Sequence, residues 1–297
     1  LLEEARRLGG GGAVHGAEVA LLLAEDNVDE AHDLACRRRE GAWYERVALV
    51  RVLLRRGSLD EAAALASELA CSVEVPGLHE LAAVLSEGIG AYDRAESHLD
   101  HVERLTPLAA AAPRAALVAY RETLAARRKG STRALPVPIV VQDAYTCVPA
   151  ALAAVAAYYG QPVSMRALAD ALCYEGTSPL AQRRWLEGAG YVVRGFCLTR
   201  AAVVALLEQE LPFLLYLNGL DLGHVAVVVG YDEEHDELVV RDPAFAEPRR
   251  AELTALLAAE EPWGARAEVF VPQAEASKLE AVPFEGVAVM EACHALD

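Results

Sequence analysis

The stretch QDAYTCVPAALAAVAAYYG at residues 142–160 decides how the second half of the chain folds. A polar start is followed by Cys147 and by an apolar run in which alanine, the strongest helix former, dominates. Pro149 is tolerated in a first helical turn, where its missing N–H is not needed, and Gly160 is a typical helix terminator. The pattern predicts a helix with Cys147 at its N-terminus, preceded by a short strand at 139–141.

Strands and helices alternate after this helix. Ser164 and Ser178 are expected to cap the starts of two helices that run to Cys173 and Ala189, because a serine oxygen accepts a hydrogen bond from a free N–H of the first turn. The other expected elements are strands at 191–196 and 212–217, a helix at 200–210, a helix at 251–259 and a strand at 267–271.

The stretch GHVAVVVGYDEEHDELVVRDP at residues 223–243 reads as two apolar strands, 225–231 and 237–241, around an acidic turn. This is a hairpin, and hairpins make antiparallel sheets. A helical lobe followed by an antiparallel sheet predicts an α+β domain.

Cys147 is the candidate nucleophile. The positive end of the helix dipole stabilises a thiolate, which is the reactive form of cysteine. The competing interpretation is a buried structural cysteine, but the polar turn before the helix favours a functional one.

His224 is the candidate base, because it starts an apolar strand after a glycine-rich loop. The hairpin brings Asp242 to the same sheet edge, since neighbouring strands lie about 4.8 Å apart. Asp221 is a competing acid, and Asp242 also fits the role of a turn former before Pro243. Among the other histidines, His98 and His101 share a helix face and are expected to face solvent.

Gln142 precedes Cys147 by five residues. Its amide N–H is a candidate donor to an oxyanion that forms beside the backbone N–H of Cys147. Together these four residues make a candidate site for acyl transfer.

The order Gln142, Cys147, His224, Asp242, with the surrounding blocks, resembles the bacteriocin-processing, or double-glycine, cysteine peptidases over about residues 136–260. The resemblance implies a papain-like fold, a bacterial cysteine peptidase with a Cys-His-Asp triad, and cleavage after a Gly-Gly leader. The sequence departs from the family at Thr146 and Val148, where an aspartate and a glycine are frequent, which concerns substrate preference. Family members are often fused to membrane transporters, and this chain shows no such segment.

Residues 1 to about 128 read as successive helices with a repeated local pattern. Asp-Glu-Ala or a similar triplet ends at Ala31, Ala62 and Ala95, with steps of 31 and 33 residues. A period near 34 is typical of tetratricopeptide repeats, in which a small residue lets paired helices approach. The residues typical of the first helix of each tetratricopeptide repeat are poorly matched, so an unrelated alanine-rich helical bundle is the alternative.

These patterns predict a tetratricopeptide-like domain at 1–129, a papain-like peptidase domain at 136–272 and a C-terminal extension at 273–297. A net charge of −17 argues against nucleic acid and anionic membranes as partners. No apolar run reaches the about 20 residues of a membrane span, and the six cysteines show no metal-ligand spacing. A cytoplasmic protein without metal or organic cofactor is expected.

The expected partners are a peptide or protein substrate and a protein bound by the helical repeats. Two alternatives use the same half of the chain differently. A transamidase or deamidase would keep the thioester chemistry and change the acceptor, and an adaptor would bind peptide without catalysis.

Overall fold

The structure is a computed structural model of the chain. It describes residues 11–25, 27–107, 110–127, 134–142, 145–174, 176–218, 223–245, 248–260 and 264–290. The chain divides into two compact units, residues 1–130 and 131–297, which we call the helical unit and the sheet unit. Each is considered by itself.

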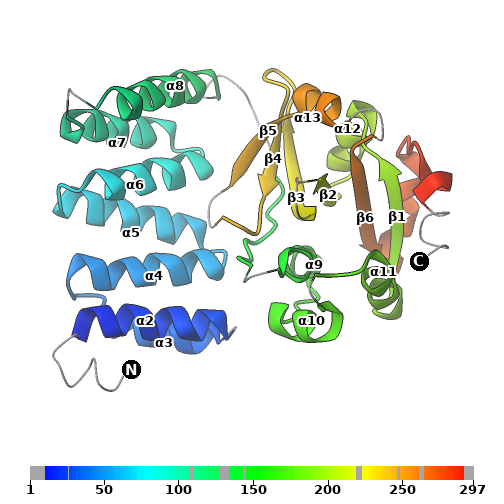
Figure 1. Cartoon of the computed structure of the whole chain (residues 1–297), viewed down its shortest axis with the longest axis horizontal. Coiled ribbons are helices and arrows are strands. Elements are labelled where there is room, and N and C mark those ends of the chain that lie inside the picture. The colour runs from blue at the N-terminus through cyan, green and yellow to red at the C-terminus, as the bar shows by residue number, and fades with distance from the viewer. Residues whose placement is uncertain are drawn as a thin grey trace. The chain divides into compact units, whose positions relative to one another are not determined.

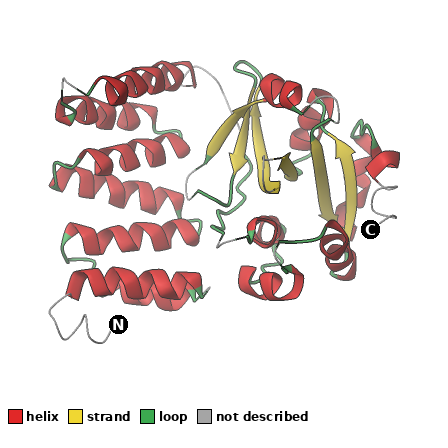
Figure 2. Ribbon diagram, in the orientation of Figure 1, coloured by secondary structure: helices red, strands yellow, loops and turns green. Residues whose placement is uncertain are grey.

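The described part of the helical unit contains only helices, stacked in antiparallel succession (Figures 1 and 2). Each helix packs against the next one along the chain. Their bounds are α2 (Gly11–Ala24), α3 (Val28–Cys36), α4 (Trp43–Arg55), α5 (Leu59–Ser72), α6 (Pro76–Gly88), α7 (Tyr92–Leu105) and α8 (Ala111–Arg127).

The repeated sequence pattern corresponds to a repeated local structure. The residues before α3, α5 and α7 share one backbone conformation, with φ between −84° and −80° and ψ between 58° and 63°. The turns before α5 and α7 contain Gly57 and Gly90 at φ 74° and 73°, a conformation that favours glycine. Ala31, Ala62 and Ala95 are fully buried, as close helix packing requires. These features agree with a repeat; its assignment as tetratricopeptide-like stays a prediction.

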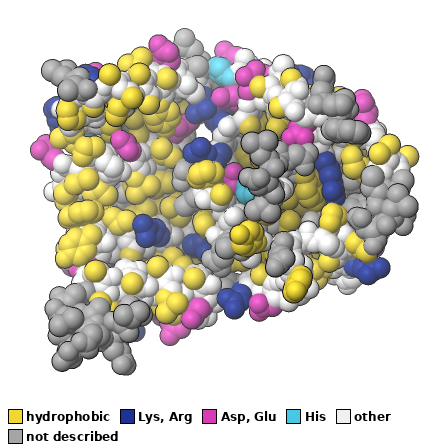
Figure 3. All heavy atoms as spheres, viewed as in Figure 1, with side chains coloured by type: hydrophobic (Ala, Val, Ile, Leu, Met, Phe, Trp, Pro, Cys, Tyr) yellow, Lys and Arg dark blue, Asp and Glu magenta, His cyan; other side chains and the backbone are white. Residues whose placement is uncertain are grey.

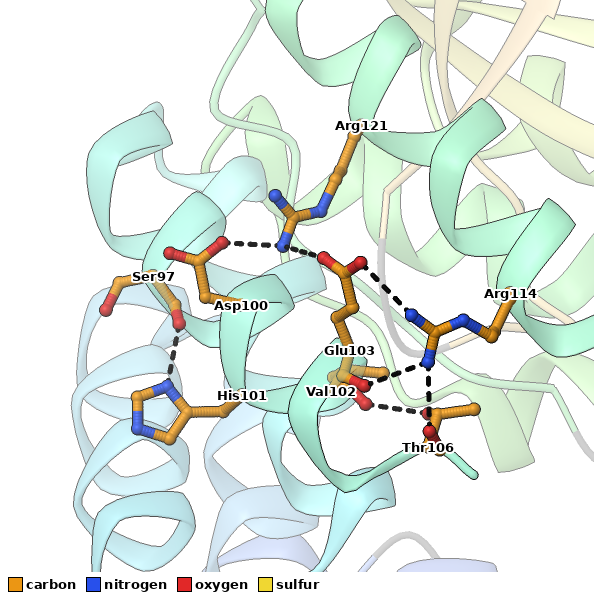
Figure 4. Close-up of polar contacts among 8 residues, drawn as sticks. All are labelled: Ser97, Asp100, His101, Val102, Glu103, Thr106, Arg114 and Arg121. Atoms are coloured by element: carbon orange, nitrogen blue, oxygen red, sulfur yellow. Dashed lines mark hydrogen bonds and ion pairs between the residues drawn. The ribbon is translucent and has the colours of Figure 1, made fainter. Parts of the chain in front are cut away.

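Helix α8 is joined to α7 by charged side chains (Figure 4). Arg121 pairs with Asp100 at 2.6 Å and with Glu103 at 3.4 Å, and Arg114 reaches Glu103 at 3.3 Å. Arg114 also donates to the Thr106 carbonyl, 3.1 Å away, at the end of α7. The contacts hold α8 against α7 at the end of the stack.

Histidines of the helical unit correct one expectation. His98 is only 5% exposed and does not face solvent. Its Nδ1 lies 3.1 Å from Nδ1 of His79, and its Nε2 lies 3.1 Å from the Ser67 hydroxyl. The prediction was wrong because it considered α7 as an isolated helix, whereas α5 and α6 cover this face.

The sheet unit begins with three helices, α9 (Cys147–Tyr158), α10 (Met165–Leu172) and α11 (Pro179–Gly188). The predicted caps are confirmed, because Ser164 accepts a hydrogen bond from the Ala167 N–H and Ser178 from the Ala181 N–H. Gly160 ends α9 at φ 71°, and the next N–H, of Gln161, bonds the Ala156 carbonyl at 2.9 Å.

An antiparallel sheet follows, with the strand order β1-β6-β2-β3-β4-β5 in its described part. The remaining elements are β1 (Tyr191–Cys197), α12 (Arg200–Glu208), β2 (Phe213–Asn218), β3 (Gly223–Asp232), β4 (Glu237–Arg241), β5 (Arg249–Glu252), α13 (Leu253–Ala259), β6 (Arg266–Pro272) and a 3₁₀ helix, η1 (Gln273–Ala281).

Alternation along the strands gives the sheet two buried faces. Val225, Val227 and Val229 of β3 pack with α9, whereas Ala226 and Val228 belong to the core beneath α12 and α13. Two apolar faces explain why β3 reads as a nearly continuous hydrophobic run rather than a strict alternation. The predicted α+β class is confirmed, because a sheet-containing unit follows a helical one along the chain.

Two local predictions were wrong. Residues 139–141 form no strand, because Pro136 and Pro138 beside them lack the N–H groups that a strand ladder needs. Strand β5 was missed because its four residues are mostly charged and show no apolar alternation.

Residues 273–290 return to the sheet. Leu279 and Val282 are buried in the core beneath α12, and the Cys197 N–H donates to the Glu285 carbonyl at 2.9 Å. Phe284 lies 4.9 Å from Phe196, measured between ring centroids. This segment therefore contributes to the core of the sheet unit.

Candidate active site

Cys147 is the first residue of α9 and is half-buried. Alanines behind it pack against the sheet and fix the position of the helix. Its sulfur accepts hydrogen bonds from the backbone N–H groups of Val225 and Val148 and is hydrogen-bonded to the His224 side chain. The thiol thus sits where the start of a helix meets the start of β3.

His224 and Asp242 meet at one edge of the sheet. His224 is the second residue of β3, and Asp242 directly follows β4, which pairs antiparallel with β3. The His224 Nε2–H donates to Asp242 Oδ1 at 2.7 Å, which leaves Nδ1 for the thiol. The two side chains are 27% and 16% exposed, so solvent screens their interaction only partly.

These contacts shift the acidities of the thiol and imidazole in complementary directions. Burial alone would raise the pKa of Cys147, but hydrogen bonds from His224 and the Val225 N–H outweigh it, and the pKa lies below its ordinary value. Hydrogen bonds to Asp242 and Cys147 raise the pKa of His224 to about 9, against the effect of burial. Both shifts favour a thiolate–imidazolium pair at neutral pH.

Asp242 is held in place by more than the imidazole. Its Oδ1 also accepts the Ala244 N–H at 2.9 Å. Burial would raise the pKa of this carboxyl, but the bonds from His224 and Ala244, together with the nearby charge of Arg249, keep it below its usual value. Asp242 is therefore ionised at neutral pH and oriented toward His224.

Gln142 is attached to the same region by its backbone. Its N–H donates to the Pro243 carbonyl at 2.8 Å, which links the segment before Cys147 to the residue after Asp242. Its side-chain Oε1 is buried and makes no hydrogen bond with the described residues. The role of Gln142 as an oxyanion donor stays a prediction.

The structure brings Cys147, His224 and Asp242 together, whereas the competing acid Asp221 lies outside the described residues. Sequence reasoning missed the backbone donors of Val225, Val148 and Ala244. No sequence signal could reveal them, because every residue except proline carries the same N–H group.

Among the described residues, no group of three or more His, Cys, Asp or Glu side chains could hold a metal ion. Within the same part of the chain, every helix is too short or too polar to cross a bilayer.

Residues 134–267 match the model of the Peptidase C39 like family. This match supports a cysteine peptidase function for the sheet unit.

One similar solved structure is the peptidase domain of Streptococcus ComA, a bi-functional ABC transporter involved in a quorum sensing pathway. It is 23% identical to this chain, with a TM-score of 0.39. The match covers 46% of this chain and 97% of that one. The peptidase domain of Streptococcus mutans ComA is 18% identical with a TM-score of 0.33, covering 45% and 98%. Among curated proteins, none matches the chain.

Proposed function

We propose that this protein is a cysteine endopeptidase in which Cys147, His224 and Asp242 form the catalytic triad. The observation that carries the proposal is the hydrogen-bonded chain from the Cys147 thiol through the His224 imidazole to the Asp242 carboxylate. The lowered pKa of the thiol and the raised pKa of the imidazole favour nucleophilic catalysis near neutral pH.

In the proposed reaction, the Cys147 thiolate forms a bond to the carbonyl carbon of a peptide. The oxyanion receives hydrogen bonds from the Cys147 N–H and the Gln142 amide. His224 gives its proton to the leaving amine as the C–N bond breaks, which leaves a thioester. His224 then takes a proton from water, which attacks the thioester and releases the carboxylic acid and the thiolate.

The helical unit is proposed to recruit a substrate or partner protein. In Figure 3, hydrophobic side chains gather over the described part of this unit. Leu21, Trp43, Tyr44 and Val118 are each at least 39% exposed, although large apolar side chains are costly to leave in water. Stacked helical repeats commonly present such surfaces to peptides or helices.

The test is the pH dependence of Cys147 alkylation, read by mass spectrometry in the parent and in His224→Ala. We expect a midpoint well below the pH of about 8.5 that is typical of a free thiol, and a higher midpoint in the variant. Cys71, an exposed thiol of the helical unit, gives a reference curve in the same sample. An ordinary midpoint that is unchanged by His224→Ala would exclude the thiolate–imidazolium pair.

The reaction itself is tested with synthetic peptides that contain Gly-Gly, the sequence suggested by the family, and with Ala-Ala controls. Product masses separate the chemistries, because hydrolysis adds water, transamidation adds an amine, and deamidation adds about one dalton. Binding without any product, in a protein whose Cys147 reacts normally, would favour the adaptor.

A further inference from the structure

Exposed aromatic side chains lie close to the proposed triad. In the described part of the sheet unit, four large apolar side chains are at least 39% exposed, and three of them are Tyr145, Tyr174 and Phe245. Tyr145 precedes Cys147 by two residues, and Phe245 follows Asp242 by three. Single exposed apolar residues are common, but several of them at one site are a feature of binding surfaces.

Tyr145 exposes its ring from an unfavourable backbone conformation. Its φ is 63°, which a bulky residue rarely adopts, and its side chain is 62% exposed. The Cys173 Sγ–H donates to the Tyr145 carbonyl over 3.8 Å, so the turn before the nucleophile contacts the loop that carries Tyr174. The Tyr174 N–H bonds the Gly176 carbonyl at 2.9 Å within this loop. Unfavourable conformations of this kind cluster at binding and catalytic sites.

Phe245 is held beside the carboxylate of the proposed triad. Its N–H donates to the Asp242 carbonyl at 3.0 Å. The guanidinium carbon of Arg249 lies 4.3 Å from the centre of the Phe245 ring, a favourable cation–π distance. An aromatic ring that is fixed before binding loses little conformational entropy when a ligand covers it.

The proposed reaction assigns the two halves of a substrate to these rings. His224 gives its proton to the leaving amine, so the residue after the cleaved bond lies on the side of His224 and Asp242, next to Phe245. The acyl half stays attached to Cys147, next to the turn of Tyr145 and the loop of Tyr174. A peptide across the site would thus meet aromatic surface on both sides of the cleaved bond.

We propose that Phe245 binds an apolar side chain of the residue after the cleaved bond, and that Tyr145 and Tyr174 bind an apolar side chain of the acyl half. The preferred substrate is therefore an extended peptide with apolar residues on both sides of the bond. This inference rests on the proposed endopeptidase function, because the reaction assigns the two halves.

The experiment measures peptide binding without turnover. Four fluorescent peptides share Gly-Gly and carry either Leu or Ser directly before it and directly after it. Their dissociation constants are measured by fluorescence anisotropy with the full chain carrying Cys147→Ala, which cannot form a thioester. Each Leu should lower the dissociation constant about tenfold relative to Ser, because its side chain leaves water. In the parent, kcat/KM for the four peptides should follow the same order.

Variants in the same background separate the two halves. Phe245→Ala should remove the preference for Leu after Gly-Gly and keep the preference before it, and Phe245→Leu should retain both. Tyr145→Asn combined with Tyr174→Ser should have the opposite effect to Phe245→Ala, and asparagine tolerates the backbone conformation of residue 145. Val289→Ser is the control, because Val289 is 61% exposed and should leave both preferences unchanged.

Peptides that bind equally, or not at all, would overturn the inference. So would a loss of both preferences together in Phe245→Ala, which would indicate a general change of structure. The proposed function is judged separately in the parent. Binding with both preferences but without cleavage of any peptide would disprove the endopeptidase and keep the binding surface. Equal cleavage of all four peptides would keep the endopeptidase and overturn the inference.

Discussion

Replacing Asp242 with asparagine tests whether the carboxylate controls the protonation of His224. Asparagine has the same shape and can still accept the His224 Nε2–H bond, which is 2.7 Å long in the parent. The substitution therefore removes the charge and leaves the orientation of the ring unchanged. Its effect on pH dependence measures electrostatics rather than geometry.

The magnitude follows from the imidazole. The pKa of His224 is about 9, against an ordinary 6.5, which corresponds to about 3 kcal/mol in favour of the charged ring. Asp242 is the largest cause and Cys147 the second. Loss of an adjacent charge typically changes a pKa by about 1–3, so the pKa of His224 should fall to between roughly 6 and 8 in Asp242→Asn.

The assay is kcat/KM for peptide cleavage as a function of pH. An imidazolium must donate a proton to the leaving amine, so activity should fall as the pH rises through the pKa of His224. The upper limb of the profile should lie near pH 9 in the parent and at least about one pH unit lower in Asp242→Asn. Glu233→Gln, which removes an exposed carboxylate from the same hairpin, should leave the limb in place. An upper limb that is identical in the parent and Asp242→Asn would refute the reasoning.

Three predictions concern stability. Burial lowers the pKa of His98 to about 4, below its ordinary 6.5. As the pH falls, the unfolded state therefore binds a proton at this histidine before the folded state does. The helical unit should thus lose stability as the pH falls from 6.5 to 4. This decrease in unfolding free energy amounts to about 3 kcal/mol. In urea titrations at several pH values, His98→Gln should reduce the decrease, whereas His32→Gln should not. Ala62→Leu overpacks a fully buried position and should cost about 1–3 kcal/mol, while Ala64→Leu on the exposed face of the same helix should change the unfolding free energy by less than about 0.5 kcal/mol. Ser178→Ala removes the cap of α11 and should lower the unfolding free energy of the sheet unit by about 1 kcal/mol; no change would show that the cap is dispensable.

Sequence patterns predicted the elements whose local and tertiary preferences agree. Helix α9 combines alanine composition with Gly160 as a stop, and the β3–β4 hairpin combines apolar strands with a polar turn. The pattern failed where the tertiary setting decided the outcome. Residues 139–141 are apolar but lie beside two prolines, and β5 is polar but forms an edge strand of the described sheet.

The candidate site also has features that the sequence predicts and features that it does not. Residue types and spacing were enough to select Cys147, His224 and Asp242, because the hairpin geometry limits which side chains can meet. The hydrogen bond from the Gln142 N–H to the Pro243 carbonyl could not be foreseen, because it involves only backbone atoms.

The proposed nucleophile and its two proposed partners come from separate stretches of chain, α9 and the β3–β4 hairpin. These stretches are joined through α10, α11, β1, α12 and β2. A cut between α11 and β1, at the turn containing Gly190, would thus give one fragment with the thiol and another with the imidazole and carboxylate. Neither fragment alone holds a complete reactive centre. Fused to two proteins of interest, such fragments would make cleavage a reporter of their association.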